Sequence, residues 1–111
     1  MKTLKFIVNE QLLTLDPECD VSSLVPGTNG VVRASFTFSS DWRNCMKVAA
    51  FYSNLGREFE PQVLKNGEVC EIPAEVLKKS IFKVKVFGKK SDQTIPFSTN
   101  KVTIYQKGGM S

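Results

Sequence analysis

The sequence contains no histidine and only three cysteines among its 111 residues. Without histidine, Ser–His–Asp and Cys–His catalysis of the usual form are excluded. Cys19, Cys45 and Cys70 form an odd, widely spaced set without a CxxC pair, which predicts neither a disulfide framework nor a metal clip. We therefore expect free thiols in a reducing compartment such as the cytoplasm, with Cys70 as a small core residue.

Long hydrophobic runs and glycine-rich phosphate loops are missing as well. No stretch approaches the roughly 18 apolar residues that would cross a bilayer. The opening MKTLKFIVNE starts like a signal peptide, but its apolar run ends at Asn9 and Glu10, and no small-residue cleavage site follows. Gly27, Gly30 and Gly56 match neither of the usual phosphate-loop spacings. We expect a first β-strand here, and no membrane partner.

Carboxylates are sparse and do not form an obvious acid–base pair. Asp16, Glu18 and Asp20 are the only cluster, a weak calcium candidate for which we expect a solvated loop instead. Glu58 and Glu60 alternate with a phenylalanine, which is typical of the solvated face of a strand. The sequence therefore predicts a protein that is not an enzyme and holds no cofactor or metal.

The formal net charge is +4, which would favour an acidic partner or nucleic acid. The basic residues are spread along the chain, however, and the densest groups are two pairs, Lys78 with Lys79 and Lys89 with Lys90. Such pairs are more typical of a solvated face and a charged turn than of a nucleic-acid-binding stripe. We expect no nucleic-acid partner, and keep a nucleic-acid-binding barrel as a minor alternative.

Alternating apolar and polar residues predict a series of short strands. The expected strands cover residues 4–8, 31–38, 47–53, 57–64, 69–72, 81–87, 94–97 and 101–105, and Leu12, Leu13 and Leu15 form a further apolar run. Asn66 and Gly67 predict a tight hairpin turn, because both residues tolerate positive φ. Residues 18–30 read as a long loop, residues 88–92 as a turn, and residues 73–77 as one helical turn that opens at a proline.

These elements predict an all-β fold, an immunoglobulin-like antiparallel β-sandwich of about seven or eight strands with one short helical turn. A small barrel is the alternative. Residues 1–105 are expected to form a single domain, followed by a flexible tail at residues 106–111. Trp42 is expected to be a core anchor, with an exposed binding role as the alternative. The expected structural anchors are Phe36, Phe38, Trp42, Phe51, Ile72, Pro73, Leu77, Val84 and Val86.

Several segments also resemble, in order, a module of phage virion proteins. The segments are FTFSSDW at 36–42, KVAAF at 47–51, NGEVCEIPAEVL at 66–77 and FKVKVFG at 82–88. The module lies at the N-terminus of baseplate upper proteins and in related tail-fibre and head-fibre proteins of phages of Gram-positive bacteria. The resemblance spans roughly residues 31–88, and its middle element is the most specific part.

The resemblance implies attachment to a virion, in the capsid or in the baseplate and tail. Family members commonly continue into a fibre or coiled coil, and we expect this short chain to act as an accessory, adaptor or decoration subunit. Its partners would be other virion proteins, with homo-oligomer contacts in the particle, after synthesis in the host cytoplasm. A small phage-encoded inhibitor of a host protein is the alternative. Our candidates for interface contacts are Arg33, Arg43 and Arg57. The alternative is that these arginines are simply solvated surface residues.

Overall fold

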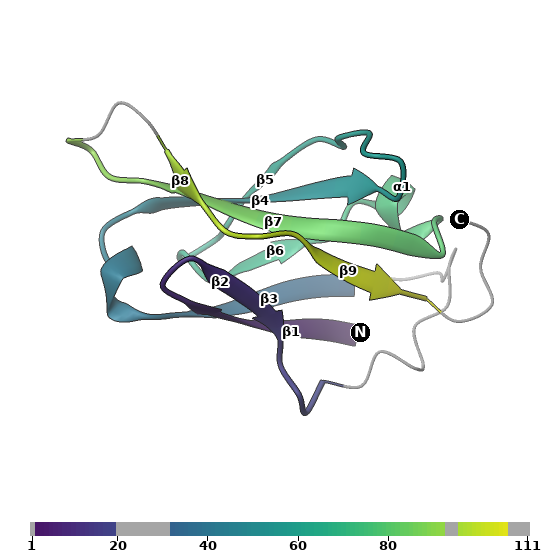
Figure 1. Cartoon of the computed structure of the whole chain (residues 1–111), viewed down its shortest axis with the longest axis horizontal. Helices are drawn as coiled ribbons and strands as arrows, with labels where there is room; N and C mark the ends of the chain where they lie inside the picture. The colour runs from purple at the N-terminus through teal and green to yellow at the C-terminus, as the bar shows by residue number, and fades with distance from the viewer. Residues whose placement is uncertain (1, 20–31, 93–95, 107–111) are drawn as a thin grey trace.

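The computed structural model describes residues 2–19, 32–92 and 96–106, and within these ranges the chain forms two β-sheets packed face to face (Figure 1). The strands are β1 (Lys2–Asn9), β2 (Leu12–Leu15), β3 (Val32–Phe38), β4 (Met46–Ser53), β5 (Gln62–Val63), β6 (Val69–Glu71), β7 (Ile81–Lys89), β8 (Phe97–Ser98) and β9 (Val102–Tyr105). A 3-10 turn, η1 (Ser40–Trp42), and one helical turn, α1 (Ala74–Leu77), complete the described elements. The expected all-β sandwich is confirmed.

The first sheet has the strand order β2-β1-β3-β6. β1 pairs with β2 as an antiparallel hairpin and with β3 in parallel, in a register that runs from Lys2 opposite Val32 to Val8 opposite Phe38. The antiparallel sandwich that we expected thus contains one parallel pair, β1 with β3, among otherwise antiparallel pairs. Alternation of apolar and polar residues looks the same in both kinds of ladder, so the pattern carries no information about strand direction.

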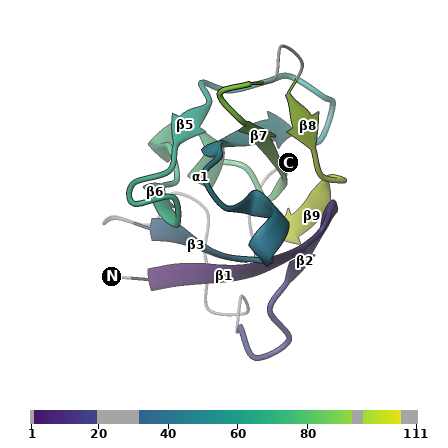
Figure 2. The same ribbon diagram turned by 90° about the vertical axis from the view of Figure 1, so that its left-hand side faces the viewer.

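The second sheet has the order β5-β4-β7-β8, and β9 also pairs with β7. Its centre is the long antiparallel pair of β4 and β7, with register from Met46 opposite Lys89 to Ser53 opposite Phe82. Figure 2 looks at the end of the sandwich that carries η1 and shows the two layers on opposite sides of the core. The turn η1 links β3 in one layer to β4 in the other.

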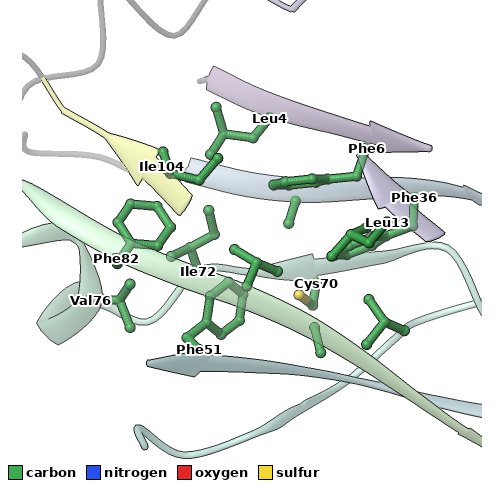
Figure 3. Close-up of a cluster of buried hydrophobic side chains, with 14 of the residues drawn as sticks. Leu4, Phe6, Leu13, Phe36, Phe51, Cys70, Ile72, Val76, Phe82 and Ile104 are labelled. Atoms are coloured by element: carbon green, nitrogen blue, oxygen red, sulfur yellow. The ribbon is translucent and has the colours of Figure 1, made fainter. Parts of the chain in front are cut away.

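The space between the sheets is filled by side chains from both layers, and Figure 3 shows part of this core. Most of the expected anchors are buried in it: Phe36, Trp42, Phe51, Ile72, Leu77, Val84 and Val86. Phe38 is half-buried and packs against the core, and Pro73 is half-buried immediately before α1. Cys70 lies in the core, as expected.

The turn at Asn66 and Gly67 forms with φ values of 55° and 70°, but its two arms separate. β5 pairs with β4 in one sheet, whereas β6 pairs with β3 in the other, so the turn crosses between layers. Only an isolated bridge between Lys65 and Val69 closes the expected hairpin. The local signal for the turn was correct, but each arm finds a longer partner strand elsewhere.

Two boundaries differ from expectation. β7 continues through Gly88 to Lys89, because Gly88 pairs with Lys47 and Phe97 where a turn was expected. Gln106, expected to begin a flexible tail, is buried, and its side-chain N–H groups donate to backbone carbonyls of residues 77 and 79. The expectations for residues 20–30, 94–95 and 107–111 lie outside the described residues.

Candidate protein-interaction surface

The three candidate arginines are all exposed, but the structure does not bring them together. Arg33 lies on β3 opposite Glu71 and borders a hollow of about 160 Å³. Arg43 borders a second hollow of about 380 Å³, and Arg57 a third of about 330 Å³. Arg43 precedes the eight residues of β4 and Arg57 follows them, so they lie roughly 25 Å apart at about 3.3 Å per residue. No single arginine-lined surface results.

The outward side of the second sheet is a better candidate. Residues 49 and 51 of β4 and residues 82, 84 and 86 of β7 point into the core, so their neighbours in sequence point outward. We call this surface the basic face; its members are Met46, Val48, Ala50, Tyr52, Val63, Ile81, Lys83, Lys85, Phe87, Lys89, Thr103 and Tyr105. Its lysines are Lys83, Lys85 and Lys89, all on β7, and its strands carry no aspartate or glutamate. The charge of this face is therefore strongly one-sided.

Lysine side chains cover the aromatic rings of the basic face. The Lys85 Nζ lies 5.0 Å from the ring centroid of Phe87, and the Lys101 Nζ lies 4.1 Å from that of Tyr52. Both distances are within the range of cation–π attraction. The apolar lysine stems lie along the sheet while their charges reach water, which explains why Ala50 and Tyr52 are buried on the outward side.

Exposed apolar side chains surround these lysines. Met46, Val63 and Tyr105 are 60%, 63% and 66% exposed, and they make up three of the five large hydrophobic side chains that are exposed in the described ranges. Apolar and cationic groups therefore alternate over one sheet face. Exposed apolar groups beside charges of one sign are typical of a surface that binds another protein.

Tyr52 does not add negative charge to this face near neutral pH. Burial raises the pKa of its hydroxyl above the ordinary value, and the neighbouring carboxylate of Glu58 raises it further. Glu58 and Glu60 are themselves exposed, as expected for a solvated face. No phenolate therefore forms at Tyr52 near neutral pH to oppose the lysines of the basic face.

The cysteine and acidic side chains of the described residues are the groups to consider for a metal site and for a thiol nucleophile. They contain no group of three or more histidine, cysteine, aspartate or glutamate side chains placed to hold a metal ion. Burial raises the pKa of the Cys70 thiol to about 12, with a smaller contribution from Glu71, so this thiol is a poor nucleophile. No helix in the described ranges is long and apolar enough to cross a membrane.

The sequence predicted the outward lysines of the basic face but not the apolar residues beside them. The alternation of Lys83 and Lys85 with the buried Phe82, Val84 and Val86 correctly places the lysines outside. Which strands lie beside them was not predictable, so the contribution of Met46, Val63 and Tyr105 was missed. The alternative of an exposed binding role for Trp42 is wrong, because this side chain is completely buried.

No protein-family model matches the sequence, and no curated protein sequence matches it. The fold and the basic face are therefore the observations from which a function can be argued.

Proposed function

We propose that this protein is a non-enzymatic phage virion structural subunit that docks onto the particle through its basic face. It acts as an accessory, adaptor or decoration subunit, on the baseplate and tail or on the capsid and head fibre. The single observation that carries the docking role is a sheet face with three outward lysines, Lys83, Lys85 and Lys89, and exposed apolar groups but no carboxylate on its strands. The resemblance of residues 31–88 to virion modules supports the location.

A domain of this size offers only a limited contact area, about 800 Å² per partner in a standard interface. We therefore expect weak binding by a single copy and stable attachment in a symmetric array, where neighbouring copies raise the effective concentration. Homo-oligomer contacts within the particle follow from the same reasoning. The complementary partner surface is acidic, because the lysines of the basic face attract carboxylates and repel other cations.

Nucleic acid is a poorer match to this face than an acidic protein. Proteins that bind single strands commonly stack bases on exposed aromatic rings. Here the rings of Phe87 and Tyr52 are covered by the ammonium groups of Lys85 and Lys101, and Tyr52 is buried, which leaves Tyr105 as the exposed ring of this face. We place the protein in the virion after synthesis in the host cytoplasm.

Adding back the purified protein tests the proposal. Particles that lack this gene product are mixed with the protein, and rebinding is visualised by electron microscopy with and without nuclease. Nuclease-insensitive binding at regular positions is the expected result, and mass spectrometry then gives the copy number. A copy number of tens to hundreds indicates the capsid, and a small multiple of three or six indicates the tail. A protein that ignores particles and instead co-purifies with one host enzyme in a one-to-one complex is an inhibitor, and the virion proposal is then wrong.

A further inference from the structure

A hollow of about 380 Å³ lies at the η1 end of the sandwich, on the seam between the two sheets. The end of β3 forms one wall and the start of β4 another, while η1 and the turn at residues 65–68 close its two ends. This hollow does not belong to the basic face, which covers the outward side of the second sheet.

The edge of β3 is unpaired where it borders this hollow. The Val32 carbonyl accepts from the Ile72 N–H (2.9 Å), and the Phe36 N–H donates to the Glu68 carbonyl (2.8 Å), so even-numbered residues of β3 turn their backbone groups towards β6. The ladder then stops, because the Glu68 N–H donates to the Lys65 carbonyl (3.0 Å) inside the turn.

Three backbone groups are left on this edge. The Phe36 carbonyl and the Phe38 N–H and carbonyl point the same way as the paired groups of Val32, and they have no hydrogen-bond partner among the described residues. Strand β1, on the other side of β3, bonds to the odd-numbered residues of β3 instead. For example, the Ser39 N–H donates to the Val8 carbonyl (2.9 Å). Unpaired groups of this kind are a template for another strand.

Other sheet edges are protected in ways that this one is not. On β2, the Leu13 N–H donates to Asn100 Oδ1 (2.7 Å), and its carbonyl accepts from Asn100 Nδ2 (3.0 Å). The side-chain amide thus takes the place of a neighbouring strand. On the other sheet, β5 is only two residues long and follows Pro61, which has no N–H. The edge at Phe36 and Phe38 has neither kind of cover.

The charges around the hollow indicate what could fill it. Lys47 holds its Nζ 5.3 Å from the ring centroid of Phe38, and Arg43 is exposed beside it. Glu68, at the opposite end near the turn, is the one carboxylate among the lining residues. The Lys47 Nζ also lies near the turn, 3.2 Å from where a Cβ of Gly67 would stand, and it donates to the Cys45 carbonyl (3.4 Å). An acidic side chain on an incoming strand would therefore meet Arg43 at the η1 end and Lys47 closer to the turn.

We propose that the hollow is a second binding site, at which an extended acidic segment of a partner protein adds as a short strand beside β3. The segment pairs with the Phe36 carbonyl and with both backbone groups of Phe38, and its aspartate or glutamate contacts Lys47 and Arg43. Main-chain hydrogen bonds supply the affinity and the carboxylate supplies the selectivity, as in other cases of strand addition. The proposal goes beyond docking through the basic face and does not depend on it.

A random octapeptide library selected against the whole chain provides the probe. We expect enriched peptides to carry aspartate or glutamate, and a synthetic peptide from the selection to shift the Phe38 amide signal in ¹H–¹⁵N NMR spectra. Methylating the backbone nitrogens of that peptide one at a time should weaken binding about tenfold at the nitrogen that donates to the Phe36 or Phe38 carbonyl, although the charge is unchanged.

Matched variants locate the site. Lys47→Gln should weaken peptide binding about tenfold, whereas Lys85→Gln, which removes the same charge from the basic face, should leave it unchanged. Circular dichroism melts establish that both variants fold. The proposal is overturned if the library yields no acidic binder, if every N-methylated peptide binds as well as its parent, or if Lys85→Gln weakens binding as much as Lys47→Gln. Because the test uses peptides only, its failure leaves the result of the particle-rebinding experiment unaffected.

Discussion

The indole ring of Trp42 lies directly against the backbone of Gly88. A Cβ added to Gly88 would stand 2.5 Å from Cζ3 and 2.8 Å from Cε3 of Trp42, closer than atoms of folded proteins approach. The ring is also held by Phe97, with centroids 4.5 Å apart, and its Nε1–H donates to the Glu10 carbonyl (2.6 Å). Through these contacts Trp42 packs η1 against β7 and hydrogen-bonds it to the turn between β1 and β2.

Gly88→Ala should therefore destabilise the protein by about 1–3 kcal/mol, because the extra methyl group overpacks a full core. Denaturant unfolding measures the loss. Trp42→Leu in the same chain makes room for the methyl group, so the double variant should lose less than the sum of the two single variants. Additive losses would show that the ring does not limit residue 88.

Trp42→Ala should cost about 3 kcal/mol, as expected for the loss of a large core side chain. Trp42→Phe keeps much of the packing and removes only the hydrogen bond to the Glu10 carbonyl and part of the ring, so its loss should be smaller. Thermal or denaturant unfolding followed by circular dichroism provides both values. An alanine variant that unfolds at the wild-type midpoint would show that the Trp42 ring does not stabilise the fold.

Stability should fall at high pH in a way that depends on Cys70. The folded chain raises the pKa of this thiol from 9.0 to about 12, so the folded state keeps a proton that the unfolded state loses. This contribution is fully present below about pH 9 and is lost between about pH 9 and 12, by up to about 1.4 kcal/mol per pH unit. Cys70→Ala is less stable than the wild type at neutral pH because of the cavity, but the difference should narrow at high pH. A difference that is constant from about pH 8 to 10.5 would contradict the raised pKa.

Reducing agents should change neither the fold nor assembly. Cys19, Cys45 and Cys70 are all free thiols, and Cys70 is buried in the core. Melting curves and particle binding are compared with and without dithiothreitol. A variant with all three cysteines replaced by serine that cannot assemble, together with a reduced wild type that also fails, would show that a bridge is needed.

Reversing charge on the basic face should impair docking without unfolding the protein. Lys83→Glu combined with Lys85→Glu should weaken binding to particles by about tenfold or more. Raising the salt concentration should also weaken the binding of the wild-type protein, because salt screens the same charges. Lys5→Glu combined with Lys78→Glu is the matched control, because both lysines are exposed away from this face and the net charge changes equally. Equal losses in the two double variants would mean that only net charge matters.

The core-facing pattern of single strands was readable from the sequence. Val84 and Val86 alternate with Lys83 and Lys85, and a strand with that pattern can bury only one of its two faces. The turn at Asn66 and Gly67 was equally clear, because few residues accept the positive φ values found there. These features are local, so the residues involved determine them without help from the rest of the chain.

Strand pairing was decided only by the tertiary structure. Nothing in residues 2–8 distinguishes a parallel from an antiparallel neighbour, and nothing around Asn66 shows that the two arms of its turn enter different sheets. The basic face needs Met46, Tyr105 and the β7 lysines on one side of the same sheet, although they are far apart in the sequence. The open edge at Phe38 exists because β6 begins only at Val69, after the chain has crossed from the other sheet through the turn at residues 65–68. The sequence by itself determined which side of each strand is buried, since that depends on the alternation of its own residues; only the fold decided which strands are neighbours, since that depends on contacts between distant segments.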